Sequence, residues 1–75
     1  MTNQPTTSIQ FQRANGTFAD VWTTDSDMLA VHADFVSLNN NHIVDECRMY
    51  QAIGVESVVI RSADSVVHIP IEQCV

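Results

Sequence analysis

The dipeptide Asn15-Gly16 constrains the fold of this 75-residue chain most strongly, because it divides residues 8–24, SIQFQRANGTFADVWTT, into two alternating segments. Asn-Gly favours a two-residue type I′ turn, in which both central residues have positive φ angles. That turn predicts a hairpin in which residue 14 lies opposite 17, 12 opposite 19 and 10 opposite 21. The register places Ile9, Phe11, Phe18 and Trp22 on one face, which we expect to enter the core, and Gln10, Gln12, Thr17, Ala19 and Val21 on the other.

A second hairpin is predicted in residues 56–72, ESVVIRSADSVVHIPIE. A turn over Ala63-Asp64 pairs residue 62 with 65, 60 with 67 and 58 with 69. One face then holds Val58, Ile60, Val67, Ile69 and Ile71, and the other holds Val59, Arg61, Val66 and His68. Pro70 has no amide hydrogen, so it belongs at a sheet edge or where its nitrogen faces away from the ladder.

The segment between the hairpins is expected to be helical. An apolar stripe runs through it at spacings of three and four residues: Met28, Val31, Phe35, Leu38, Ile43, Cys47, Tyr50 and Ile53. Thr24 and Asp25 are candidate N-caps, and Gly54 is placed to end the helix as its C′ residue. The asparagines at 39–41 have poor helix propensity and tolerate left-handed geometry, so two helices are an alternative. Since the stripe passes through them with little phase error, we expect one long helix over residues 28–53, kinked at that point.

These elements predict an α+β fold of the order ββαββ, a four-stranded, mainly antiparallel sheet with the helix on its more apolar face. With 75 residues and 45% hydrophobic content, the chain suits one packed domain, which we place at residues 9–75. Residues 1–8 are polar and are expected to form a flexible tail. They lack the basic and apolar regions of a signal peptide, and no apolar run reaches the roughly 18 residues of a membrane span.

The charge balance argues against two classes of partner. The chain has three arginines, no lysine and nine acidic residues, which gives a net charge of −6. Direct binding to a nucleic-acid backbone or to an acidic membrane needs clustered cations, so neither is expected. An acidic coat mostly serves solubility, and in some proteins it imitates nucleic acid and occupies a basic groove.

No catalytic, cofactor or metal site is predicted. The candidate metal ligands are His42, Cys47, His68 and Cys74, and their spacings are not the close pairs of structural zinc sites. Cys47 falls on the helical stripe and is expected to be a small core residue. No glycine-rich loop is present to bind a phosphate. We therefore expect a cytoplasmic protein that is not an enzyme and that has two free thiols.

The second face of the predicted sheet is the candidate interaction surface. Val59 and Val66 are diagonal neighbours on the second hairpin, and Val21 lies on the corresponding side of the first. Arg61 and His68 surround them, which gives a modest apolar patch with a polar rim on a face without a helix. Scattered surface valines are the alternative. Because so short a chain gains stability from association, we expect these five residues to meet a second copy, as a homodimer, or another protein.

The order of hairpin, long helix and IGVESVVIRSADSVVHIPIE, residues 53–72, resembles the roadblock family, a dynein light-chain type of domain. The resemblance covers roughly residues 9–72 and lies in the pattern of elements. It implies a non-catalytic protein that dimerises and that regulates small GTPases or serves as a light chain in a larger assembly.

Two functions are consistent with these features. The favoured one is a small non-enzymatic interaction or regulatory module that self-associates through its sheet. The alternative is an acidic inhibitor or nucleic-acid mimic from a mobile element, which blocks a basic nucleic-acid-binding protein. This alternative predicts that the acidic residues gather on one face of the molecule.

Overall fold

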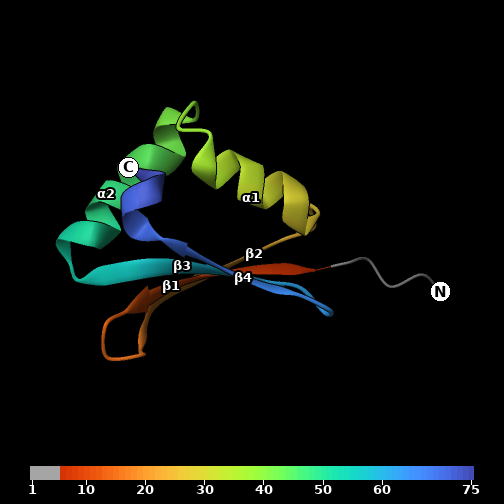
Figure 1. Cartoon of the computed structure of the whole chain (residues 1–75), viewed down its shortest axis with the longest axis horizontal. Coiled ribbons are helices and arrows are strands. Elements are labelled where there is room, and N and C mark those ends of the chain that lie inside the picture. Colours follow the sequence, from red (N-terminus) through yellow and green to blue (C-terminus); the bar gives the residue numbers. More distant parts are fainter. Residues whose placement is uncertain (1–5) are drawn as a thin grey trace.

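The computed structural model describes residues 6–75 and has the element order ββααββ. The elements are β1 (Thr7–Arg13), β2 (Phe18–Thr24), α1 (Met28–Val36), α2 (Asn41–Ala52), β3 (Val55–Arg61), β4 (Val66–Pro70) and the short 3-10 helix η1 (Ile71–Cys74). The four strands form one antiparallel sheet in the order β2-β1-β3-β4. Figure 1 shows both helices and η1 on the same side of this sheet. The predicted α+β class and the four-stranded antiparallel sheet are thus confirmed.

Residues 1–5 of the predicted tail, residues 1–8, lie outside the described residues. The last two residues of that tail, Thr7 and Ser8, belong to β1. Thr7 is buried, and its Oγ1 donates a hydrogen bond of 2.8 Å to the backbone oxygen of Ser26. This bond ties the start of β1 to the loop that precedes α1. None of the helices in residues 6–75 is long and apolar enough to cross a membrane.

The first hairpin has a different turn from the one predicted. The backbone nitrogen of Arg13 donates to the oxygen of Thr17 (2.8 Å), and the nitrogen of Gly16 donates to the oxygen of Arg13 (3.0 Å), so the loop has three residues, 14–16. Within this loop only Gly16 has a positive φ angle, +87°. This is a type I turn followed by a left-handed glycine, and not a type I′ turn. Asn15 stabilises the loop through its side chain, whose Oδ1 accepts hydrogen bonds from the nitrogen (3.0 Å) and the Oγ1 (2.6 Å) of Thr17.

A bulge in β2 at Ala19 restores the predicted register farther along the hairpin. Gln12 lies opposite Phe18 instead of Ala19, whereas Gln10 lies opposite Val21 as predicted. Phe18 therefore lies on the face away from the helices and is 43% exposed, so its predicted place in the core is wrong. The core side keeps the other three residues predicted for it, Ile9, Phe11 and Trp22.

The second hairpin has the predicted register. Ile60 pairs with Val67, and Val58 pairs with Ile69. The turn closes with a 2.8 Å hydrogen bond from the nitrogen of Ser62 to the oxygen of Ser65. Pro70 lies on β4, which is an edge strand, as its missing amide hydrogen requires.

Two helices take the place of the single long helix that we expected. α1 ends at Val36, and Leu38 then adopts a left-handed conformation with φ +60°. Asn40 starts α2, because its Oδ1 accepts hydrogen bonds from the backbone nitrogens of His42 (3.1 Å) and Ile43 (3.3 Å). An asparagine side chain that binds the first free amides of a helix favours a new start over continuation, even where the apolar stripe continues in phase.

The outer ends of the two helices are also capped. Asp27, and not Thr24 or Asp25, is the N-cap of α1, since its Oδ1 accepts a 2.6 Å hydrogen bond from the nitrogen of Leu29. Gly54 follows α2 with φ +98°, in the C′ position predicted for it.

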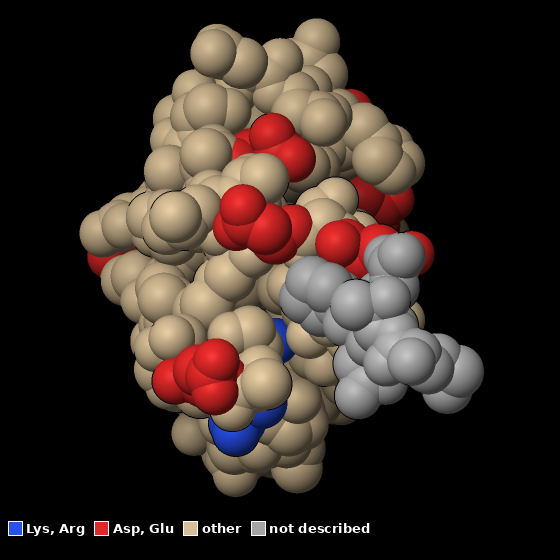
Figure 2. Space-filling view, turned by 90° about the vertical axis from the view of Figure 1, so that its right-hand side faces the viewer, with Lys and Arg blue, Asp and Glu red and all other residues tan. Residues whose placement is uncertain are grey.

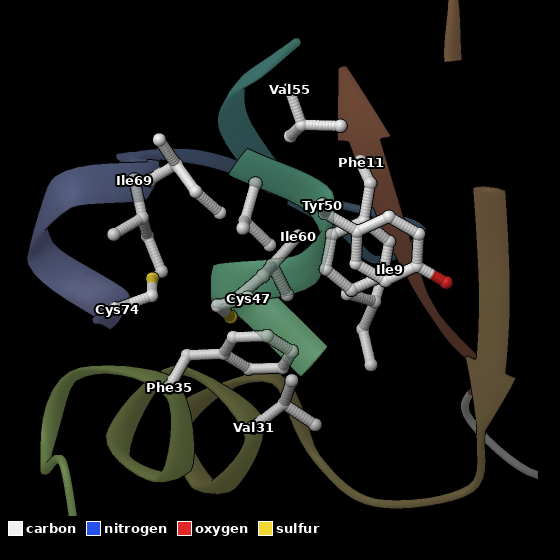
Figure 3. Packing of buried hydrophobic residues seen from close by; sticks show 12 residues of the cluster. Ile9, Phe11, Val31, Phe35, Cys47, Tyr50, Val55, Ile60, Ile69 and Cys74 are labelled. Atoms are coloured by element: carbon white, nitrogen blue, oxygen red, sulfur yellow. The ribbon is translucent and has the colours of Figure 1, made fainter. Parts of the chain in front are cut away.

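The core lies between the sheet and the helices, and Phe11 is fully buried in it beside Tyr50 (Figure 3). The Tyr50 ring stacks on Phe11 with a centroid distance of 4.1 Å, and the Trp22 ring meets it edge-on at 4.7 Å. Such aromatic pairs add to the free energy of area burial. The buried cluster comprises Ile9, Phe11, Val31, Phe35, Cys47, Tyr50, Val55, Val58, Ile60, Ile69, Ile71 and Cys74.

Candidate interaction surface

The face of the sheet that points away from α1 and α2 is the candidate surface, and we call it the outer face. Its members follow from the strand register, because directly paired residues share a face and alternate residues return to it. They are Ser8, Gln10 and Gln12 of β1; Phe18, Val21 and Thr23 of β2; Ser57, Val59 and Arg61 of β3; and Val66, His68 and Pro70 of β4. No helix among the described residues covers this face (Figure 1).

All five residues predicted for the surface have register positions on the outer face. Arg61 pairs directly with Val66, Val59 pairs with His68, and Val21 lies on the opposite edge strand. Val21 and Val66 are 48% and 44% exposed, and Arg61 and His68 are exposed as well. Val59 differs, because it is only 2% exposed. Its expected role as an exposed apolar contact is therefore wrong.

The centre of the outer face contains a polar atom without a partner. Gln10 lies on the central strand β1, between Val21 on one side and Val59 on the other. Its Oε1 is buried, and no hydrogen-bond donor among the described residues reaches it. An unpaired buried acceptor costs about 1–3 kcal/mol, so this atom makes an unfavourable contribution to the stability of the single chain. The sequence predicts that Gln10 lies on this face, but alternation alone could not show that its Oε1 is buried.

Phe18 adds a large apolar side chain to this face. It pairs with Gln12 and is 43% exposed, comparable to the two valines on the edge strands. A two-residue turn would place Phe18 on the core side, which is why the sequence predicts it there. A three-residue loop with a bulge, the other common hairpin closure for Asn-Gly, would have placed it on the outer face.

The outer face has no acidic residue at any of its register positions, although the chain has nine. Asp20 lies opposite Phe11, on the helix side of β2, and Glu56 lies at the irregularity where β3 begins. The others are on loops, turns and helices: Asp25, Asp27, Asp34, Asp45, Glu46, Asp64 and Glu72. Figure 2 shows acidic atoms in separate patches with uncharged surface between them. On that side of the molecule they form no continuous acidic stripe.

The edge of the sheet at β2 is partly blocked against a further strand. Asp20 Oδ1 accepts a 2.8 Å hydrogen bond from the backbone nitrogen of Val21, so this edge amide is already occupied. The other edge, β4, is short and ends in Pro70. Inserted charges, bulges and proline are the features that prevent edge-to-edge pairing. The outer face is therefore a better candidate for contact than either edge.

Asp20 also anchors β2 to α2. Its Oδ2 accepts hydrogen bonds from the Tyr50 hydroxyl (2.5 Å) and from Trp22 Nε1 (3.2 Å). These bonds, first of all the one from Tyr50, lower the pKa of Asp20, while burial and the hydrogen bond to Asp20 raise the pKa of Tyr50 to about 12. At neutral pH the carboxylate is charged and the phenol neutral, which suits a structural anchor.

The four candidate metal ligands do not come together. His42 is exposed on α2 and His68 is exposed on the outer face, whereas Cys47 and Cys74 are buried in the core. Within residues 6–75, no group of three or more metal-binding side chains is present.

A shallow groove of about 420 Å³ lies where α2, β3 and η1 meet. Its lining residues are Gln51, Gly54, Val55, Glu56, Pro70, Ile71 and Glu72. The lining offers two carboxylates and no histidine, cysteine or serine that could act as a nucleophile or base.

Comparison of the chain with protein-family models, curated proteins and solved structures finds no match. The resemblance to the roadblock family therefore stays a prediction from the order of the elements.

Proposed function

We propose that this protein is a non-enzymatic interaction module that forms a homodimer through the outer face of its sheet. The observation that carries the proposal is the one-sided architecture. Helices cover one face, while the other has three exposed apolar side chains, Phe18, Val21 and Val66, and no acidic residue. An exposed apolar patch on a small domain is a common site of association.

Charge supports a second copy as the occupant. Two chains with a net charge of −6 repel each other over most of their surfaces. The outer face is where two copies can approach without bringing carboxylates together. A two-fold axis through this face would place equivalent patches against each other.

The size of the face sets the expected strength of the dimer. Four strands about 4.8 Å apart and five to seven residues long cover roughly 19 by 20 Å, or about 400 Å². Stable complexes bury about 800 Å² on each partner. We therefore expect a weak, reversible dimer with a dissociation constant in the micromolar range.

Sedimentation velocity at graded protein concentrations tests this proposal. The wild-type protein should shift from monomer to dimer across the micromolar range, and Val66→Glu and Val21→Glu should each remain monomeric because they place a charge on the patch. Leu29→Glu is the matched control, since Leu29 is 78% exposed but lies on α1. A wild-type protein that stays monomeric throughout, or a Leu29→Glu variant that loses the dimer equally, would refute the proposal.

The alternative function, an acidic mimic that blocks a basic nucleic-acid-binding protein, would use the helix side and the loops, where the acidic residues lie. The separate acidic patches in Figure 2 offer it less support than a continuous stripe would. Salt distinguishes the two functions. Added salt weakens binding to a basic partner, whereas it screens the repulsion between two acidic copies and so strengthens or preserves the dimer.

A further inference from the structure

The two cysteines, 27 positions apart in the sequence, meet in the core. Cys47 lies on α2 and Cys74 lies on η1, and both are fully buried in the same apolar cluster. Figure 3 shows their sulfur atoms as neighbours within this cluster. Neither thiol is in a disulfide, and the Cys74 Sγ donates a long hydrogen bond of 4.0 Å to the backbone oxygen of Pro70. Two neighbouring thiols on separate elements can be joined by a disulfide once small local movements bring their sulfur atoms into bonding geometry.

The two thiols differ in their readiness to ionise. A hydrogen bond donated by the Cys47 thiol to a Cys74 thiolate lowers the pKa of Cys74. The same bond, together with burial, raises the pKa of Cys47. Since the thiolate is the reactive form, this difference favours Cys74 as the first nucleophile.

The two segments also differ in how easily they open. Cys47 lies in the middle of the 12-residue helix α2. Cys74 lies in a four-residue 3-10 helix that has no side-chain cap, and its neighbours Glu72 and Gln73 are exposed. The hydrogen bonds of 3-10 helices are weaker than those of α-helices, so η1 can open locally while the rest of the fold persists. Opening of η1 exposes Cys74 to a reagent in solution.

We propose that Cys47 and Cys74 form a site of reversible thiol–disulfide exchange with a small-molecule disulfide such as oxidised glutathione. The Cys74 thiolate attacks one sulfur of the reagent, which forms a mixed disulfide and releases one glutathione thiolate. While η1 is still open, Cys47 loses its proton to solvent and attacks the Cys74 sulfur, and η1 closes after the second glutathione has left. This step forms the Cys47–Cys74 bond and releases the second glutathione. The protein is oxidised by two electrons, and one glutathione disulfide is reduced to two thiols.

The product would join η1 covalently to α2. The closed loop contains the whole second hairpin, residues 55–70, so the bond restricts the unfolded chain and stabilises the fold. By thermodynamic linkage, the factor by which the disulfide shifts the folding equilibrium toward the folded state is also the factor by which folding favours the disulfide over the two thiols. For a loop of this length the factor is on the order of 100-fold. This inference does not depend on the proposed dimer, because both cysteines are on the helix side of the sheet.

A redox titration of the purified protein tests the proposal without any substitution. The protein is equilibrated with graded ratios of reduced and oxidised glutathione, in native buffer and in concentrated urea, and free thiols are then alkylated for intact mass spectrometry. The native chain should convert to a monomeric species that lacks two hydrogen atoms and takes up no alkylating reagent. The value of [GSH]²/[GSSG] at which half of the chain is oxidised should be on the order of 100-fold higher for the native chain than for the chain in urea. Equal midpoints, or disulfides formed only between chains, would overturn the proposal.

Two variants identify the order of the steps. Cys47→Ala should accumulate a stable glutathione adduct at Cys74, because no second thiol is present to displace it. Cys74→Ala should take up glutathione at least tenfold more slowly, since its remaining thiol is buried in α2. Circular dichroism checks that both variants fold. If an alanine variant does not fold, the serine variant at the same position is used in its place. Equal rates of adduct formation in the two folded variants would contradict the assignment of Cys74 as the first nucleophile.

Discussion

Val59 and Val66 provide a matched pair for testing how the outer face is built. Both are valines on this face, but Val59 is 2% exposed on a central strand and Val66 is 44% exposed on an edge strand. Truncation of a buried valine to alanine removes two methyl groups, each worth about 0.8 kcal/mol, and leaves a small cavity. We therefore expect Val59→Ala to lower the free energy of unfolding by about 2 kcal/mol. Val66→Ala should lower it by about 0.5 kcal/mol, the usual range for a surface position.

Urea denaturation at low protein concentration, followed by circular dichroism and by the fluorescence of Trp22, measures both values. Both substitutions make the same chemical change within a strand, so their difference reports how closely each side chain is packed and how much of it is buried. For a domain of this size, a difference of about 1.5 kcal/mol corresponds to roughly 6–12 °C in Tm. Equal losses for the two variants would show that the single chain does not bury Val59. In that case the centre of the outer face would be open to solvent.

Three further predictions concern the turn, the helix break and the aromatic anchor. Gly16→Ala should lower the free energy of unfolding by about 1–2 kcal/mol in urea denaturation, because φ is +87° at this position, although an added Cβ would meet no atom within 4 Å. Asn15→Ala should lower it by less, and an equal loss for the two variants would indicate a type I′ turn. Asn40→Ala should cost about 1 kcal/mol through loss of the α2 N-cap, and an unchanged urea midpoint would show that α2 begins without it. Because the pKa of Tyr50 is raised to about 12, its contribution to stability should be complete below pH 10 and decline as the pH rises toward 12. Because the pKa of Asp20 is lowered, its contribution should decline as the pH falls below about 4, and Tyr50→Phe should weaken both dependences if the anchor is real.

Local patterns in the sequence predicted the second hairpin well. Its alternation left only one register that puts Val58, Ile60 and Ile69 on the core face, and the structure has that register. The first hairpin was harder, because Asn-Gly is compatible with two loop lengths. The choice between them depends on where Phe18 and Trp22 pack, and that is a tertiary effect.

The break between α1 and α2 shows a limit of periodicity. The apolar stripe continues in phase from Phe35 to Ile43, so it could not distinguish one helix from two. The capping hydrogen bonds of Asn40 decided the outcome. The three consecutive asparagines were a signal of this break, because their poor helix propensity was a better guide there than the continuing phase of the apolar stripe.

The long-range features of the molecule had no sequence signal. The contact between Cys47 and Cys74 depends on how η1 returns to α2 after β4, and their spacing resembles no known motif. The burial of Val59 and of Gln10 Oε1 depends on the packing of side chains across three strands. An alternating pattern assigns a residue to a face but does not show how much of that residue its neighbours cover.

An NMR dilution series of the wild-type protein tests the central claim most directly, because it maps association onto individual residues. Amide signals of the outer face, including those of Gln10, Val21 and His68, should shift as the concentration falls through the micromolar range, while the signal of Leu29 on α1 should stay in place. Signals that do not change with concentration, or changes confined to the helices, would contradict the claim that the uncovered face of the sheet is the site of association.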